Sequence, residues 1–249
     1  MDHNKQTQWC AKFARRVRRK LYAIMKTDWY DYLLFTVSPQ FVDRRVEKLL
    51  SNCDVLEKES RAGLDDFLSL FSHLNLPEGT KLGVKGGDFG LGGYVKLMIV
   101  LPNGSMINPS EIKHDSASVE SIWEKTMLRW ASSQFYLFWH DGYNECVVLT
   151  GPASQVEKDI KHVSFHGSFL DAVYGEDNEL MPLEYRQLFT KMDFSPKVAL
   201  NNNAIEIEYY VYNPFSGISK YIALEEGCCS DGEDMDGNCV IPHWCGVCY

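Results

Sequence analysis

The apolar residues of the first third of the chain recur at helical spacing. In residues 1–35 they form one stripe, and the arginines fall on the opposite side. The stripe consists of Trp9, Phe13, Val17, Leu21 and Ile24. Ser38-Pro39 then supplies an N-cap hydroxyl followed by a proline, which predicts the start of a second helix. A third helix is expected over 58–74, so residues 1–76 form a helical subregion.

After this subregion the pattern favours hairpins. Residues 94–101 are a β-prone run, and Pro102-Asn103-Gly104 turns the chain back through 105–108. Two further hairpins are predicted, 135–140 with 145–150 and 204–212 with 218–224, together with helices at 118–131, 153–162 and 183–192. The strands of each hairpin pair antiparallel because their connections are too short for a crossover. In 204–212, apolar residues alternate with Glu206 and Glu208, which predicts one solvent-exposed face.

These elements predict an α+β fold. A helical N-terminal third is followed by a largely antiparallel sheet of about six strands with helices packed on it, and then by a Cys-rich C-terminal tail. The chain has 249 residues, of which 45% are hydrophobic and 24% charged, enough for a proper core. We therefore expect a single α+β domain over residues 1–226 and a separate acidic tail over 227–249.

Composition also bears on location. No stretch approaches the ~20 apolar residues of a membrane span. The polar N-terminus leads into a basic segment, so it does not resemble a signal peptide. We expect a soluble, cytoplasmic protein whose thiols stay reduced.

The net charge of −9 conceals an asymmetry along the chain. Residues 1–30 carry eight Lys and Arg side chains against two Asp, and among them are Arg15, Arg16, Arg18 and Arg19. A chain this acidic is not a general nucleic-acid binder. The basic helix is interpreted as a docked helix with a solvated face, as a contact for an acidic protein partner, or as a contact for nucleic acid or an anionic membrane surface.

The strongest chemical pattern lies in the tail. Five of the eight cysteines of the chain occur there, in a segment with few aliphatic residues. In a reducing compartment zinc is the usual cross-link for such a segment, and Cys245-x-x-Cys248 has the spacing that directs two thiolates at one ion. The candidate zinc ligands are Cys228, Cys229, Cys239, His243, Cys245 and Cys248.

Other interpretations of the tail stay open. Disulfides would form in an oxidising compartment, and a reduced tail without metal needs no cross-link. A redox-active Cys-x-x-Cys is less favoured because that motif normally opens a helix. The acidic run 231–238 does not place an Asp and a Glu at the first and last positions of an EF-hand loop, so calcium binding is disfavoured.

Catalytic motifs give little support for an enzyme. The glycine-rich segment 86–93 lacks the Lys-Ser/Thr of a phosphate-binding loop and leads into a strand, so it is interpreted as a connection or bulge. His162 and His166, four residues apart, are possible metal ligands on one helix face. The leading hypothesis is a non-enzymatic binding or regulatory protein with a zinc-stabilised tail. The alternative is a hydrolytic enzyme with a site near His140, Asp141 and Cys146.

Overall fold

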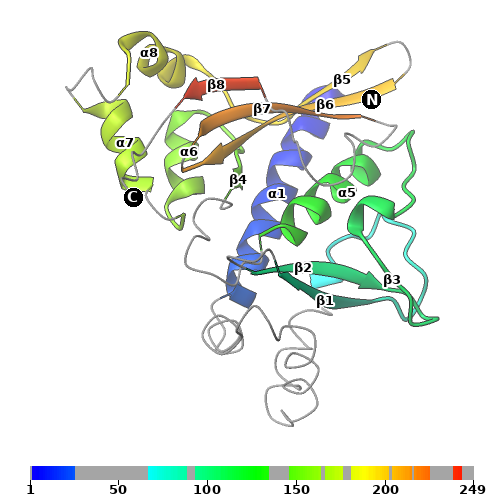
Figure 1. Ribbon diagram of the computed structural model, residues 1–249. Helices are drawn as coiled ribbons and strands as arrows, with labels where there is room; N and C mark the ends of the chain where they lie inside the picture. The colour runs from blue at the N-terminus through cyan, green and yellow to red at the C-terminus, as the bar shows by residue number, and fades with distance from the viewer. Residues whose placement is uncertain are drawn as a thin grey trace. The chain divides into compact units, whose positions relative to one another are not determined.

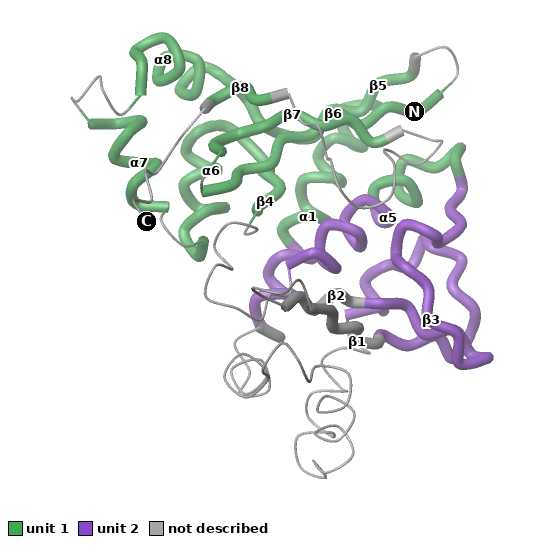
Figure 2. Tube along the Cα trace, in the orientation of Figure 1, with its two compact units in different colours: residues 1–15, 116–123, 142–249 green, residues 16–115, 124–141 purple. Residues whose placement is uncertain are grey.

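The computed structural model describes residues 2–25, 67–88, 93–134, 146–163, 166–175, 181–201, 204–214, 216–224 and 238–242 (Figure 1). The predicted helix from Ser38, the first part of the third helix, the strand 135–140 and most of the tail lie outside these residues. The chain divides into two compact units (Figure 2). Unit 1 comprises residues 1–15, 116–123 and 142–249, and unit 2 comprises residues 16–115 and 124–141. The prediction of one domain over 1–226 stays a prediction.

The predicted N-terminal helix is present as α1, His3–Met25. Its first turn is closed by Asp2, whose carboxylate accepts a hydrogen bond from the Asn4 N–H at 3.1 Å. Phe13, Val17 and Leu21 of the predicted stripe are buried, and Trp9 stacks on Phe13 with ring centroids 5.1 Å apart. α1 contains no acidic residue, so its exposed side is uniformly basic or neutral.

Unit 2 contains a three-stranded antiparallel sheet in the order β1-β2-β3. β1 spans Lys81–Asp88, β2 spans Gly93–Val100 and β3 spans Met106–Ile107. β2 and its return through β3 confirm the predicted hairpin. β1 was not predicted, and it corrects the interpretation of residues 86–88, because Gly86 pairs with Val95 and Asp88 with Gly93, while residues 89–92 lie outside the described residues. Glycine has low β-propensity, so the sequence pattern did not reveal this strand, which is defined by its backbone pairing with β2.

Helix α5, Val119–Ser132, starts where the sequence predicts it. The Ser118 hydroxyl accepts a hydrogen bond from the Ser121 N–H at 3.2 Å, which is the expected N-cap. A short 3-10 helix, η2 (Pro109–Glu111), precedes it and has both hydrogen bonds of a capping box. The predicted third helix is wrong at its end, because the described residues are helical only at 67–68 and turns follow, but Phe67, Leu68 and Phe71 are buried as expected.

Unit 1 is built on a five-stranded antiparallel sheet. The strands are β4 (Val147–Val148), β5 (Lys197–Asn201), β6 (Ala204–Asn213), β7 (Gly217–Leu224) and β8 (Asn238–Pro242). β6 and β7 form the predicted hairpin, with Asn213 opposite Gly217, whose φ of 85° suits glycine at the turn. β6 also pairs with β4 and β5, and β7 pairs with β8. The α+β class with antiparallel sheets is thus confirmed, while the strands belong to two sheets.

Three helices enclose the core on one face of this sheet. They are α6 (Ala153–Ile160), α7 (His166–Tyr174), which was not predicted, and α8 (Leu183–Lys191) (Figure 1). Phe169 is fully buried, with its ring centroid 4.9 Å from that of Tyr212 and 5.7 Å from that of Phe189. Because Tyr212 lies on β6 and Phe189 on α8, Phe169 joins α7 to both the sheet and its neighbouring helix.

The opposite face of β6 is also covered. Tyr209 packs edge-on against Trp123 of α5, with ring centroids 5.4 Å apart. The Trp123 indole N–H donates to the Cys10 carbonyl of α1 at 2.9 Å. Glu206 and Glu208 share the other face with Tyr210 and Tyr212, so the face predicted to be solvent-exposed is half-buried at the two glutamates and buried at the two tyrosines.

Truncation of Phe169 tests this core. Phe169→Ala is expected to lower the free energy of unfolding by about 3–5 kcal/mol, because it removes a fully buried ring at the junction of α7, α8 and β6. Leu183→Ala, at a side chain that is 57% exposed, is the matched control and should change it by less than about 0.5 kcal/mol. Urea denaturation followed by circular dichroism measures both, and equal losses would contradict the assignment of the core.

Candidate functional site

The structure places one of the six predicted metal ligands. Cys239 lies on β8, at the edge of the unit 1 sheet, and its side chain is exposed. Its sulfur is 3.7 Å from the Ser216 carbonyl oxygen, and partial burial raises the pKa of the thiol. Cys228, Cys229, His243, Cys245 and Cys248 lie outside the described residues. No group of three or more His, Cys, Asp or Glu is close enough to hold a metal within the described part of the chain.

β8 itself was not predicted, and it changes the picture of the tail. Ile241 is fully buried in the same core cluster as Phe169, and Val240 packs against that cluster. Residues 238–242 of the tail are therefore fixed to unit 1 by backbone pairing with β7 and by the Ile241 side chain. The adjacent β-branched residues Val240 and Ile241 were the available clue, but a pair of β-branched residues between Cys239 and Pro242 is too short to define a strand from sequence.

The residues of the alternative, hydrolytic hypothesis are only partly placed. Cys146 is half-buried immediately before β4, whereas His140 and Asp141 lie outside the described residues, so this hypothesis stays a prediction. The pairing of His162 with His166 on one helix face is wrong. α6 ends at Ile160 and α7 begins at His166, so the two histidines do not share a helix.

The four predicted arginines of α1 do not present one common surface. Arg16 and Arg19 are exposed, Arg15 is half-buried, and Arg18 is only 9% exposed. An α-helix turns about 100° per residue, so four basic residues within five positions point to different sides. Arg16 and Arg19 are therefore available to solvent, whereas Arg15 and Arg18 are half-buried or buried within the fold.

Arg15 reaches from α1 to the loop that follows β4. Its Nη1 donates to the Thr150 carbonyl oxygen at 3.3 Å and to the Thr150 Oγ1 at 3.2 Å. The Thr150 N–H and hydroxyl donate in turn to the Asp159 Oδ2, at 2.8 and 2.7 Å. The other oxygen of Asp159 accepts from the Gln155 Nε2 at 2.7 Å. Asp159 is fully buried, and the three donors compensate for its desolvation.

A glycine lets this loop approach α6. A Cβ at position 151 would lie 2.8 Å from the Gln155 Cβ, closer than real Cβ atoms come. Gly151 therefore allows Thr150 to come within hydrogen-bonding distance of Asp159 on the same helix. Thr150 is in consequence a fixed anchor for the guanidinium of Arg15.

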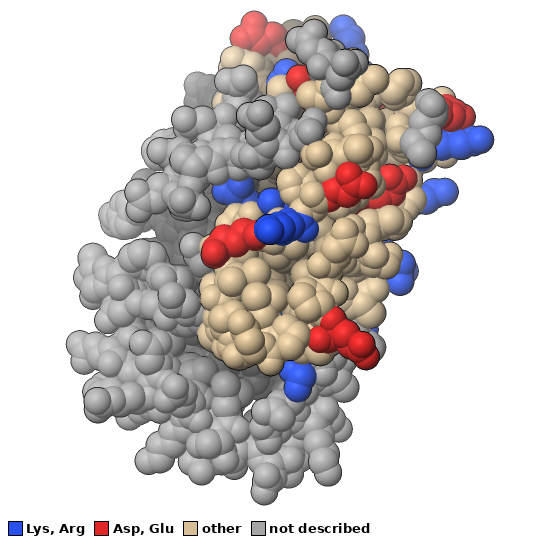
Figure 3. Space-filling model, turned by 90° about the vertical axis from the view of Figure 1, so that its right-hand side faces the viewer, with Lys and Arg blue, Asp and Glu red and all other residues tan. Residues whose placement is uncertain are grey.

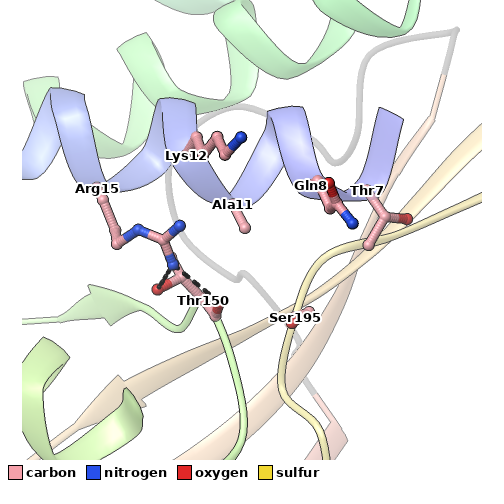
Figure 4. Close-up of a pocket in the computed structure, with 7 residues that line it drawn as sticks. All are labelled: Thr7, Gln8, Ala11, Lys12, Arg15, Thr150 and Ser195. Atoms are coloured by element: carbon pink, nitrogen blue, oxygen red, sulfur yellow. Dashed lines mark hydrogen bonds between the residues drawn. The ribbon is translucent and has the colours of Figure 1, made fainter. Parts of the chain in front are cut away.

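An open pocket of about 180 Å³ lies between α1 and this anchor (Figure 4). It is lined by Thr7, Gln8, Ala11, Lys12, Arg15, Thr150 and Ser195, all of which belong to unit 1. Among the described residues, the lining contains two cations, several neutral polar groups and no carboxylate. Its chemistry suits an anionic group, because guanidinium and ammonium donors form charge-assisted hydrogen bonds with oxyanions. Sequence reasoning missed this pocket because Thr150 and Arg15 are 135 positions apart.

Unit 2 contains a buried acid, Glu124, paired with an exposed histidine, His73. The Glu124 side chain is 1% exposed, and its oxygens contact the His73 N–H and Nδ1, both at 2.7 Å. Burial raises the pKa of Glu124, and the hydrogen bonds from His73 oppose that shift. The pair joins the turn that contains His73 to α5. On the face shown in Figure 3, acidic and basic side chains of the coloured residues are interspersed, without an extended patch of one sign.

The comparisons with known proteins do not indicate a function. No family model, curated protein or solved structure matches the chain. Within the described residues, no helix is long and apolar enough to cross a membrane.

The buried carboxylate of Glu124 predicts a pH dependence. Its pKa is raised above the ordinary 4.5 in the folded state, so the folded protein retains the proton longer than the unfolded chain. The resulting stabilisation is fully present below pH 4.5 and is lost as the pH rises through the raised pKa. The variant Glu124→Gln has no ionisable group at this position, so its free energy of unfolding lacks this contribution to the pH dependence.

The difference in free energy of unfolding between the wild type and Glu124→Gln should therefore fall as the pH rises from about 4 to about 7. Denaturant titrations across this range measure it, with Glu184→Gln, which removes an exposed carboxylate of α8, as the control. A difference that grows with pH would show that the hydrogen bonds from His73 outweigh burial.

Proposed function

We propose that this chain is a non-enzymatic binding or regulatory protein whose C-terminal tail is cross-linked by zinc on the edge of the unit 1 sheet. The observation that carries the proposal is the concentration of five cysteines in the tail, of which the structure places Cys239. β8 holds this cysteine at the surface of a rigid element, inside the segment in which the other tail cysteines are concentrated. The sheet serves as the platform, and the tail serves as the contact module for a protein partner.

The composition of the tail supports a cross-link. Residues 225–249 contain six carboxylates and no Lys or Arg, and Val240 with Ile241 is the longest aliphatic run among them. A segment with so little to bury needs a metal or a disulfide to be ordered beyond β8. The proposal places the protein in a reducing compartment such as the cytoplasm, where thiols bind zinc rather than pair with one another.

β8 restricts which residues can share one ion. A strand rises about 3.4 Å per residue, so the Cα atoms of Cys239 and Pro242 are separated by about 10 Å. Tetrahedral ligands of zinc lie within about 4 Å of one another. Cys239 joins Cys245 and Cys248 at one ion only if the chain turns back after β8. Otherwise Cys228, Cys229 or His243 complete the site with Cys245 and Cys248, without Cys239.

Metal analysis of the full chain, purified without chelator, tests the proposal. The wild type is expected to contain about one equivalent of zinc, and Cys245→Ser/Cys248→Ser to contain less than about 0.2, because two thiolate ligands are lost. Cys239→Ser distinguishes the two ligand sets. It loses zinc if the tail turns back on β8 and retains it if Cys228, Cys229 or His243 complete the site.

Cys53→Ser, at a cysteine outside the tail, is the matched control and should retain its zinc. Cys10 is unsuitable as a control because it is fully buried in unit 1, and its burial raises the pKa of the thiol far above the usual range. Wild-type protein with less than about 0.2 equivalents of any thiophilic metal would refute the metal claim.

A further inference from the structure

We propose that the pocket between α1 and Thr150 binds a phosphate group, either as inorganic phosphate or as the head of a phosphomonoester. The inference is separate from the zinc proposal, because none of the described residues that line this pocket belongs to the tail. It rests on three observations: a fixed guanidinium, further donors from α1, and the lack of acidic residues among the described residues of the lining.

The guanidinium of Arg15 is held in place before any ligand arrives. Its Nη1 is bound to both oxygens of Thr150, and Thr150 is bound by its N–H and its hydroxyl to the fully buried Asp159. A long side chain that is already ordered loses little conformational entropy on binding. Arg15 has five N–H donors, and the remaining ones can serve a tetrahedral oxyanion.

Other donors of the pocket come from α1. Figure 4 shows Gln8 and Ala11 on the side of the helix that faces the pocket, beside Arg15, with Lys12 lying along the helix. Lys12 is exposed, so a change of rotamer is enough to bring its ammonium to a ligand. Among the described residues, neither Lys12 nor Arg15 forms an ion pair with a carboxylate, and α1 contains no acidic residue that would compete.

The opposite wall sets the orientation of the ligand. The Thr150 hydroxyl donates to Asp159, and the Ser195 hydroxyl lies 2.7 Å from the Asp193 Oδ1, to which it donates. Both hydroxyl protons are thus engaged by carboxylates, so the oxyanion must bind toward α1. The pocket volume of about 180 Å³ exceeds the ~150 Å³ of a cavity that holds benzene, which leaves room for a phosphate head. Because the pocket is open, the rest of a phosphomonoester stays in solvent.

Calorimetric titration of the full chain with inorganic phosphate tests the site, with NaCl added to keep the ionic strength constant, since exposed charges are screened by salt. We expect saturable binding with a Kd of about 1 mM or tighter. Gln8→Glu places a carboxylate on the rim at an exposed position and should weaken binding at least about fivefold. Arg15→Gln should weaken it by a similar factor or more.

Two matched variants separate local binding from net charge. Gln187→Glu makes the same change at an exposed position of α8, and Arg16→Gln removes an exposed cation of α1 that does not line the pocket. Both should bind phosphate within about twofold of the wild type, because their charges are solvated and screened. Glycerol 3-phosphate replaces phosphate in a second arm. Comparable affinity supports recognition of the phosphate head, whereas binding of phosphate alone restricts the site to the free ion.

The proposal is overturned if the wild type shows no saturable binding below about 20 mM phosphate, which corresponds to a negligible affinity. It is also overturned if Gln8→Glu and Gln187→Glu weaken binding equally, since only the net charge would then matter. Gln8→Glu keeps the test valid if Arg15→Gln fails to fold, because position 8 is exposed and makes no described side-chain hydrogen bond to the rest of unit 1.

Discussion

Unit 1 depends on the burial of β6 on both faces. This strand pairs with β4, β5 and β7, so its backbone groups are satisfied on either side. On one face Tyr212 packs against Phe169, and on the other Tyr209 packs against Trp123. A strand buried in this way cannot shift its register by one residue without moving both sets of side chains to the wrong layer. The helices α5, α6 and α7 are positioned by that constraint.

Asp159 provides a second constraint, and it acts on the loop beside β6. The Leu149 N–H donates to the Tyr210 carbonyl at 2.8 Å, so the chain leaves the sheet immediately before Thr150. Asp159 then binds Thr150 through two hydrogen bonds and holds the loop on α6. A buried carboxylate without donors would cost several kcal/mol. The same bonds that satisfy Asp159 therefore fix Thr150, and Thr150 fixes Arg15. The arrangement of the phosphate pocket follows from a requirement of the core.

The local parts of this fold were predictable from sequence, and the long-range parts were not. The stripe Phe13, Val17 and Leu21, the Ser118 cap and the β6–β7 hairpin are each set by residues close in the chain, and all three are present. β1 was missed because its glycines carry no β-prone side chains, although its ladder with β2 is continuous. The full burial of Tyr210 and Tyr212 depends on helices that the alternation pattern of β6 cannot reveal.

The candidate sites show the same division. A cysteine cluster can be recognised in sequence because its members lie within one segment. The pocket at Arg15 cannot, because Thr150 and Asp159 enter through the fold, and Arg15 is surrounded in sequence by basic residues that look equivalent. What distinguishes Arg15 from Arg16 is the helical angle, which turns one toward the loop and leaves the other exposed.

The buried Ile241 links the tail to the stability of unit 1. Ile241 belongs to the same core cluster as Phe169 and Phe189, so ordering of β8 and formation of that core favour each other. A metal that binds only the ordered tail stabilises the ordered state of the tail by at most the free energy of metal binding. Backbone pairing with β7 and burial of Ile241 hold β8 independently of any ion, so occupancy of the metal site need not decide whether unit 1 folds. Under the zinc proposal, the ion would instead determine the order of the tail beyond β8, and this separation lets the tail respond to metal while the sheet remains intact.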